Sequence, residues 1–163
     1  MPHPVTVVAV ALGSNLGDRA AHLDHAVARL RALLSNLRVS RYLETDPVDV
    51  VGAQGPFLNA AAVAEWTGSP RALLAHLLRV ERERHRRRPH RGAARTLDLD
   101  LILFGDRVVH EAGLRLPHPR FRERRFVLEP LCDVGPDLRD PVTGLTVREL
   151  FERLPVPRGR EPS

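Results

Sequence analysis

The chain begins with a short apolar run rich in β-branched residues, VTVVAVAL at residues 5–12, which ends at GSN. A run of this length and composition predicts a buried strand. After Asp18, a residue type favoured at helix N-caps, apolar residues recur at helical spacing, at Leu23, Val27, Leu30 and Leu34. We therefore expect a helix directly after the first strand.

Two more strands are expected before the second helix. Residues 37–45, LRVSRYLET, alternate well enough to predict a strand, and residues 46–56, DPVDVVGAQGP, have the proline, glycine and aspartate content of a loop. The next segment, FLNAAAVAEW at residues 57–66, would also allow a helix because of its alanines. The bracketing Pro56 and Gly68 favour a strand.

A second helix is expected to begin at Pro70, because Ser69 is a good N-cap and proline suits the first helical position. Its apolar face is made by Leu73, Leu74, Leu77 and Leu78. The helix runs into residues 81–95, ERERHRRRPHRGAAR, which hold no apolar residue until Ala93 and must be solvated at least in part.

The rest of the chain predicts one more strand and one more helix. TLDLDLILFG, residues 96–105, has strand character and precedes a turn at Gly105 and Asp106. Near the end, TGLTVRELFERL offers Thr146 as the cap of a last short helix. The order predicts an α+β fold: a ferredoxin-like βαββαβ mixed sheet, with helices on one face and a C-terminal appendix.

The chain length and hydropathy predict one domain. With 163 residues and 43% hydrophobic content, the chain can bury a core of its own, and we expect a single domain over residues 1–163 with its core at about 5–154. No apolar run is long enough to cross a bilayer, and the first residues do not have the pattern of a cleavable signal. We expect a cytoplasmic protein with no membrane partner.

The positive charge comes from one residue type. The net charge is +5, and all 25 basic residues are arginine. A Walker A loop and Schiff-base catalysis both need a lysine, so the sequence excludes both. The planar guanidinium suits bidentate contact with phosphate oxygens, although a GC-biased genome would explain an arginine-only composition equally well.

The fourth strand carries two carboxylates. In a regular strand Asp98, Asp100, Ile102 and Phe104 face one side, and the other side is formed by Leu97, Leu99, Leu101 and Leu103. The two aspartates are then about 6 to 7 Å apart and need a counter-charge. Arginine partners, of which Arg95 is the nearest in sequence, would meet this need, and so would a magnesium ion shared with phosphates. Spacing alone leaves both possibilities open.

Three further features suit the binding of a ligand, and each also has an explanation that involves no ligand. The arginines of residues 82–95 form either a solvated charge run, a polyphosphate-binding loop or a contact for a nucleic-acid backbone. His118 lies between two prolines that restrict its backbone, although a loop histidine is more often a surface residue. Phe57 and Asn59 share a strand face and suit a flat heterocycle, although core packing explains Phe57 equally well.

Four motifs together resemble one enzyme family over nearly the whole chain. They are ALGSNLGDR, GPFLNAA, ARTLDLDLILFG and LPHPRFRERRFVLEPL. The combination is similar to 6-hydroxymethyl-7,8-dihydropterin pyrophosphokinase. This resemblance implies transfer of the terminal diphosphate of ATP to the pterin hydroxyl, with release of AMP, in tetrahydrofolate biosynthesis.

The resemblance also implies roles for individual residues. Asp98 and Asp100 would hold two magnesium ions and, with Arg95, His118 and Arg124, would be the catalytic residues. The pterin would be bound by Thr45, Val48, Phe57, Asn59 and Phe126. ATP, the co-substrate, would be bound by Glu81, Arg86, Arg88, Arg95, His118, Arg122 and Arg124. The chain departs from many relatives at Gly92, Ala93 and Ala94, where they have a tryptophan and a glycine-proline pair, so an aromatic loop contact is absent.

We also expect a monomer with small-molecule partners only. Two rival functions remain at this point. An arginine-rich nucleic-acid-binding module of the same topology would need aromatic side chains on an exposed sheet face, yet aromatic residues make up only 4% of the chain. The other rival is an enzymatically silent relative that acts as a binding protein.

Overall fold

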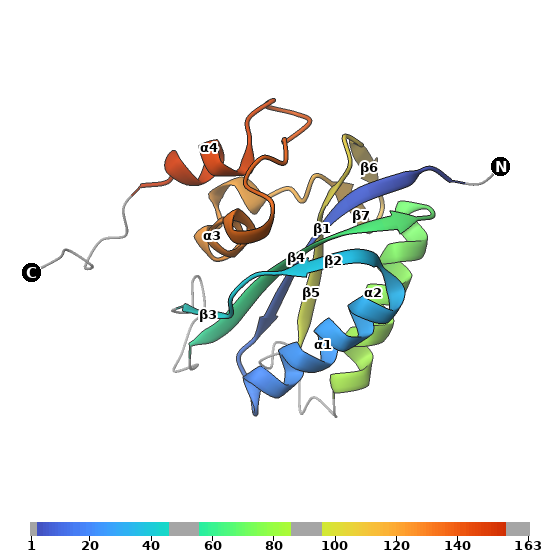
Figure 1. The fold of residues 1–163 in the computed structure, drawn as a ribbon, viewed down its shortest axis with the longest axis vertical. Coiled ribbons are helices and arrows are strands. Elements are labelled where there is room, and N and C mark those ends of the chain that lie inside the picture. The colour runs from blue at the N-terminus through green and yellow to red at the C-terminus, as the bar shows by residue number, and fades with distance from the viewer. Residues whose placement is uncertain (1–2, 46–55, 86–95, 156–163) are drawn as a thin grey trace, which may run out of the picture.

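The computed structural model describes residues 3–45, 56–85 and 96–155, and Figure 1 shows their arrangement. A sheet of five strands forms the centre of the molecule. The elements are, in order, β1 (Val5–Ser14), α1 (Arg19–Leu33), β2 (Ser35–Val39), β3 (Leu43–Thr45), β4 (Phe57–Thr67), α2 (Pro70–Arg84), β5 (Asp98–Phe104), β6 (Val109–Glu111), β7 (Leu114–Leu116), the 3-10 turn η1 (Phe121–Glu123), α3 (Arg125–Val134) and α4 (Val147–Glu152).

The predicted ferredoxin-like topology is confirmed, but the sheet is antiparallel rather than mixed. Its strand order is β2-β4-β1-β5, with β3 also paired to β4, and each of these pairs is antiparallel. Helix connections join β1 to β2 and β4 to β5, which gives each joined pair the same direction. Another strand lies between the members of each pair, so the parallel strands never become neighbours.

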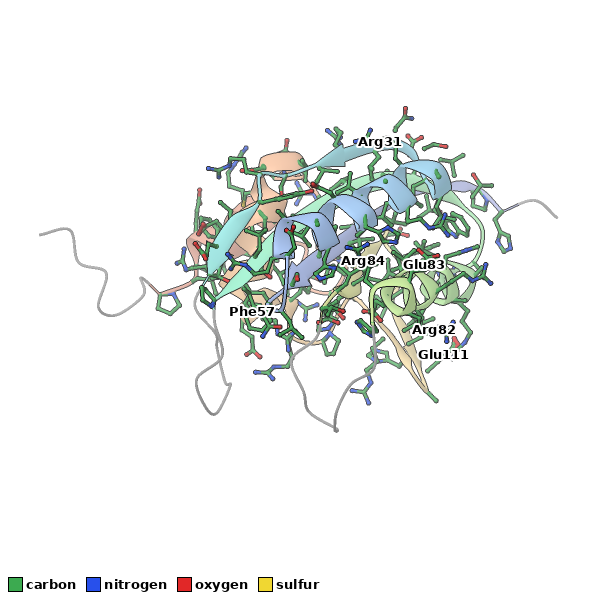
Figure 2. The ribbon with its side chains drawn as sticks, turned by 90° about the horizontal axis from the view of Figure 1, so that it is seen from below. Arg31, Phe57, Arg82, Glu83, Arg84 and Glu111 are labelled. Carbon is green, nitrogen blue, oxygen red and sulfur yellow. The ribbon has the colours of Figure 1, made fainter. Side chains whose placement is uncertain are left out.

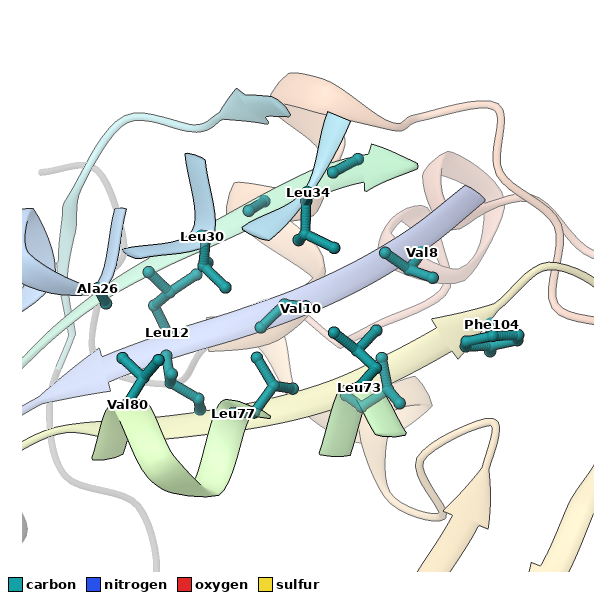
Figure 3. Close-up of a cluster of buried hydrophobic side chains, with 14 of the residues drawn as sticks. Val8, Val10, Leu12, Ala26, Leu30, Leu34, Leu73, Leu77, Val80 and Phe104 are labelled. Atoms are coloured by element: carbon teal, nitrogen blue, oxygen red, sulfur yellow. The ribbon is translucent and has the colours of Figure 1, made fainter. Parts of the chain in front are cut away.

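Helices cover both faces of the sheet, whereas the sequence predicted helices on one face and an appendix. Figure 1 shows α1 and α2 on one side, and α3 and α4 on the other. The helix-side core lies under α1 and α2, and Figure 3 shows members such as Val10, Leu12, Leu30, Leu73 and Leu77. The C-terminal core lies under α3 and α4 and includes Ala61, Val63, Phe121, Leu128 and Leu131.

The predicted helix starts are confirmed in detail. The Asp18 side chain accepts a hydrogen bond from Ala21 N, and the Ser69 side chain accepts one from Ala72 N. At the last helix, Thr146 and Glu149 form a complete capping box. Within the described residues, no helix combines the length and apolarity needed to cross a bilayer.

The predicted second strand is divided into β2 and β3 by Ser40. Its backbone N–H donates to Ala61 O at 2.8 Å, while its side-chain Oγ accepts from Ala61 N at 2.8 Å. A side-chain oxygen thus takes the place of a backbone carbonyl in the ladder, which lets the chain bend without leaving Ala61 N unpaired.

A β-bulge changes the two faces of β5. Ala9 pairs with Leu103 while the next residue of β1, Val10, pairs with Leu101, so Ile102 is an extra residue. The aspartate and leucine faces are as predicted up to this point. Beyond it the prediction is wrong, because the extra residue reverses the alternation and places Leu103 in the C-terminal core and Phe104 in the helix-side core.

Helix α3 and the β6–β7 hairpin were not predicted. Pro130 lies inside α3 and removes one helical hydrogen-bond donor, so the segment lacks the usual sequence signs of a helix. Burial compensates, because Val127, Leu128 and Leu131 pack against the sheet.

The capping box makes a testable prediction about stability. Thr146→Ala removes the acceptor for Glu149 N, so the free energy of unfolding should fall by about 1 kcal/mol. Chemical denaturation would measure the change. Thr146→Ser is the matched control because it keeps the hydroxyl, and an equal loss in both variants would contradict the capping role.

Candidate active site

The register of the sheet places three candidate residues in one row. Gly13 of β1 lies opposite Asn59 of β4 on one side and opposite Asp98 of β5 on the other. Directly opposite residues of antiparallel strands present their side chains to the same face. Asn59 and Asp98 therefore flank Gly13, with two strand spacings, roughly 10 Å, between their backbones.

The next row has the same plan. Ala11 lies opposite Ala61 and opposite Asp100. Ala11 and Ala61 belong to the C-terminal core, so this row identifies the face that carries the two aspartates. Helix α3 covers one part of that face. In another part, small residues lie between Asn59 and the aspartates.

Gly13 is needed for a close approach. A Cβ atom at this position would lie 3.0 Å from Asn59 Oδ1, which is tighter than an ordinary contact. The missing side chain therefore lets the Asn59 amide lie against β1, beside the row that ends at Asp98.

A cavity of about 360 Å³ runs along the free edge of β5. It brings together four residues of the predicted site: Glu81, Asp98, Asp100 and His118. The other walls come from α2, from the β6–β7 hairpin and from Pro119, and include Leu74, Leu78, Leu114 and Arg115.

Glu81 is buried, with 6% of its surface exposed, and it contacts the strand between the two aspartates. Its Oε2 accepts a hydrogen bond from Leu99 N at 2.7 Å. This N–H lies on the open edge of β5, so a helix side chain supplies the acceptor that a further strand would otherwise provide. Glu81 thus ties α2 to the segment that carries both carboxylates.

His118 is held in one orientation beside the aspartates. Its backbone N–H donates to Ile102 O at 2.9 Å, and its ring Nδ1 accepts from Arg120 N at 3.2 Å. Burial and the positive charge of Arg124 lower the pKa of His118, against the opposing effect of Asp98. The ring is therefore neutral at pH 7 and carries its proton on Nε2.

Three of the predicted pterin-binding residues, Thr45, Phe57 and Asn59, lie together where β3 pairs with β4. The Asn59 amide is 4% exposed and donates a hydrogen bond to Thr45 Oγ1, while Phe57 lies opposite Thr45 in the β3–β4 pair. Figure 2 shows Phe57 at the start of β4. Phe126 lies at the start of α3, with the Arg124 guanidinium carbon 5.6 Å from its ring centre. This cation–π contact joins Phe126, a predicted pterin contact, to Arg124, a predicted phosphate contact.

Arg122 and Arg84 are each held by a protein side chain. Arg122, a predicted ATP contact, forms a two-pronged ion pair with Asp140. The Nε of Arg84 donates to His22 Nδ1 at 2.9 Å, and Figure 2 shows Arg84 and Glu83 where α2 packs against α1. Burial and Arg84 lower the pKa of His22, which keeps its ring free to accept this bond.

The predicted residues Val48, Arg86, Arg88 and Arg95 lie outside the described part of the chain. Other site residues were missed by the sequence analysis, among them Leu74, Leu78 and Leu114 in the cavity wall. One signal was present: four leucines make the apolar face of α2 wider than a core contact requires. Leu73 and Leu77 are fully buried, whereas Leu78 is 44% exposed and lines the cavity.

The donor chemistry of the site fits magnesium shared with a phosphate ligand. Asp98 and Asp100 offer two carboxylates in one cavity, and magnesium is usually held by one or two carboxylates together with water and phosphate oxygens. In the described ranges, no group of three or more histidine, cysteine, aspartate or glutamate side chains could form a metal cage. A magnesium ion bound by the two carboxylates would take its other ligands from water and phosphate oxygens.

Comparison with known proteins decides the family. Residues 9–136 match the family model of 7,8-dihydro-6-hydroxymethylpterin-pyrophosphokinase (HPPK). The chain belongs to the HPPK family. The HPPK enzyme of Bacillus subtilis is 42% identical over 127 residues, which cover 77% of this chain and 75% of that protein. The Pseudomonas aeruginosa enzyme is 35% identical over 153 residues and 91% of both chains.

Solved structures show the same fold. Wild-type Plasmodium falciparum HPPK-DHPS, crystallised with SDX-DHP, superposes with a TM-score of 0.74 at 14% identity. The match covers 93% of this chain but only 44% of that longer one. The ferredoxin-like core of the HPPK family is therefore present here.

The contact between Glu81 and Leu99 N can be tested directly. Glu81→Ala leaves a buried N–H without its acceptor, so the protein should lose about 1 to 3 kcal/mol of stability. The Leu99 amide should also exchange its hydrogen faster, which NMR would measure. Glu81→Gln keeps an acceptor oxygen and should protect Leu99 better than Glu81→Ala; equal protection in the two variants would show that the bond does not hold this strand.

Proposed function

We propose that the cavity along β5 and the adjoining Asn59 group form the active site of a pyrophosphokinase. It transfers the terminal diphosphate of ATP to the hydroxyl of 6-hydroxymethyl-7,8-dihydropterin and releases AMP. The observation that carries this proposal is the row of Asn59, Gly13 and Asp98 on three neighbouring strands. It places a group suited to a heterocycle next to a group suited to phosphates.

On the pterin side, Asn59 supplies hydrogen bonds. One of its amide N–H groups is used by Thr45, which fixes the orientation of the amide. The second N–H and Oδ1 can then donate to and accept from the edge of a pterin ring. Phe57 and Phe126 would stack on the ring, and Val48, which the family resemblance adds, would complete this pocket.

On the phosphate side, neutral and charged donors act together. The Nε2–H of His118 donates to a phosphate oxygen, and Arg124 supplies positive charge beside it. Arg86, Arg88 and Arg95 would add further cations, as the resemblance implies. Asp98 and Asp100 would hold two magnesium ions, which would neutralise charge on the phosphates when bound.

The contribution of the chain to the reaction is mainly alignment. The bound pterin hydroxyl must approach the β-phosphorus in line with the departing AMP oxygen. Asn59 and Asp98 lie in one row of a rigid sheet, so both reactants are positioned by the same strand register. Glu81 holds Leu99 between the carboxylates and thereby supports their placement.

The rival nucleic-acid-binding function has little support. Such modules stack bases on an open sheet face. Here α1 and α2 cover one face and α3 and α4 cover much of the other, and the strip between Asn59 and the aspartates carries glycine and alanine instead of aromatic residues. We propose a monomer whose partners are ATP and the pterin, without nucleic acid or membrane.

The aspartates give the sharpest test of the reaction. Asp98→Asn and Asp100→Asn should each lower AMP release by about a thousandfold in the presence of ATP, magnesium and the pterin, because each removes a charged metal ligand. Asp106→Asn is the control, since Asp106 is exposed in the turn at the other end of β5. Near-normal turnover by both folded site variants would refute the metal assignment, and an inactive wild-type protein would favour the silent relative.

A substitution at Gly13 tests the proposed pterin pocket separately from the proposed phosphate site. Gly13→Ala places a Cβ atom 3.0 Å from Asn59 Oδ1, so the amide must shift and the KM for the pterin should rise about tenfold. The affinity for an ATP analogue serves as the internal control, because the nucleotide is bound by other residues. An unchanged pterin KM in the folded variant would show that this contact does not shape the pocket.

A further inference from the structure

Asp140 is a buried carboxylate outside the cavity. It has no exposed surface, and its oxygens accept hydrogen bonds from Arg122 Nε and from Arg122 Nη2 at 2.9 Å. Thr143 Oγ1 at 2.7 Å and Val142 N at 3.0 Å are its other donors. Burial alone would raise the pKa of Asp140, but these donors outweigh it and hold the pKa at about 2, so the group is ionised at neutral pH.

The turn that carries Asp140 is itself well fixed. Asp140 N donates to Leu145 O at 2.9 Å, and Gly144 N donates to Asp140 O at 2.8 Å. Val147 N, at the start of α4, donates to Leu138 O at 2.8 Å, and the Val147 side chain is fully buried in the C-terminal core. Asp140 therefore offers a rigid anchor.

Arg122 lies in the segment that presents two proposed phosphate contacts. It is the middle residue of η1, four residues after His118 and two before Arg124. The segment is attached to β5 by the bond from His118 N to Ile102 O, and Phe121 is fully buried beneath it. The Arg122 guanidinium carbon also lies 5.0 Å from the Phe121 ring centre. The ion pair thus fixes the segment at its middle.

We propose that Asp140 is a positioning residue for the reaction, which through Arg122 holds His118 and Arg124 in place for the ATP phosphates. The inference rests on the proposed function, because it takes those two residues as phosphate contacts. It changes the predicted role of Arg122 from an ATP contact to a support. Asp140 also lies beyond residues 9–136, the part that matches the family model, so the C-terminal segment takes part in building the site.

The variant to test is Asp140→Asn. Asparagine keeps one oxygen for Val142 N and Arg122 Nη2, but its amide nitrogen cannot accept from Arg122 Nε, and the negative charge of the pair is lost. Movement of a binding group by a fraction of an ångström is costly, so the affinity for a non-hydrolysable ATP analogue with magnesium should fall about tenfold, and the KM for ATP should rise in parallel. The KM for the pterin should change less than the KM for ATP, because Asn59 and Thr45 are held independently and, among the described pterin-binding residues, only Phe126 contacts the displaced Arg124.

Asp133→Asn is the matched control. Asp133 makes a similar two-pronged pair with Arg41, at 2.9 and 3.1 Å, which joins α3 to the segment between β2 and β3. Both variants are expected to lower the melting temperature, but only Asp140→Asn should weaken ATP binding. Arg122→Gln should weaken it to a similar extent, and the double variant should lose little more than either single one.

The outcomes separate the inference from the proposed function. Wild-type affinity for the ATP analogue in folded Asp140→Asn overturns the inference, as does an equal loss in Asp133→Asn. If Asp140→Asn does not fold, calorimetry on Arg122→Gln keeps the inference testable, because wild-type affinity in that variant would equally overturn it. A wild-type protein that binds the analogue but releases no AMP would refute the proposed reaction, while the comparison of affinities would still test Asp140.

Discussion

Strand β1 is paired on both sides, and the site depends on this double register. Its partners β4 and β5 bring Asn59 and Asp98 to the two sides of Gly13, and Ala61 and Asp100 to the two sides of Ala11. A slip of one residue in either pair would turn the corresponding side chains to the opposite face. The same hydrogen bonds that hold the central sheet together therefore set the distance between the two groups of the site.

Much of this arrangement could be predicted from the sequence because its signals are local. The caps at Asp18, Ser69 and Thr146 and the alternation around Asp98 are each readable within a few residues. The features that escaped prediction depend on contacts between distant segments. Burial against the sheet stabilises α3 despite Pro130, and the pairing with β1 makes Ile102 a bulge.

The same distinction between local signals and contacts of distant segments applies to the residues of the candidate site. Motifs identified Asp98, Asp100, His118, Asn59 and Glu81, and the structure brings the first three and Glu81 to one cavity. Sequence could not show that Arg122 is directed to Asp140, because the two are 18 residues apart and only the fold brings the partly exposed guanidinium to the buried carboxylate. Nor could it show that Glu81 reaches a backbone N–H of β5, since motifs carry no information about which atoms a side chain meets.

The bulge at Ile102 divides β5 into two parts whose side chains alternate differently between the two faces of the sheet. Before it, the strand alternates between carboxylates on one face and leucines on the other, and after it Leu103 and Phe104 have exchanged faces. An extra residue bends the strand and increases its local twist, so the packing of the residues after the bulge is decoupled from the orientation of the residues before it. Core side chains after the bulge can thus change in size while Asp98 and Asp100 keep their face, which relieves a single strand of two conflicting demands.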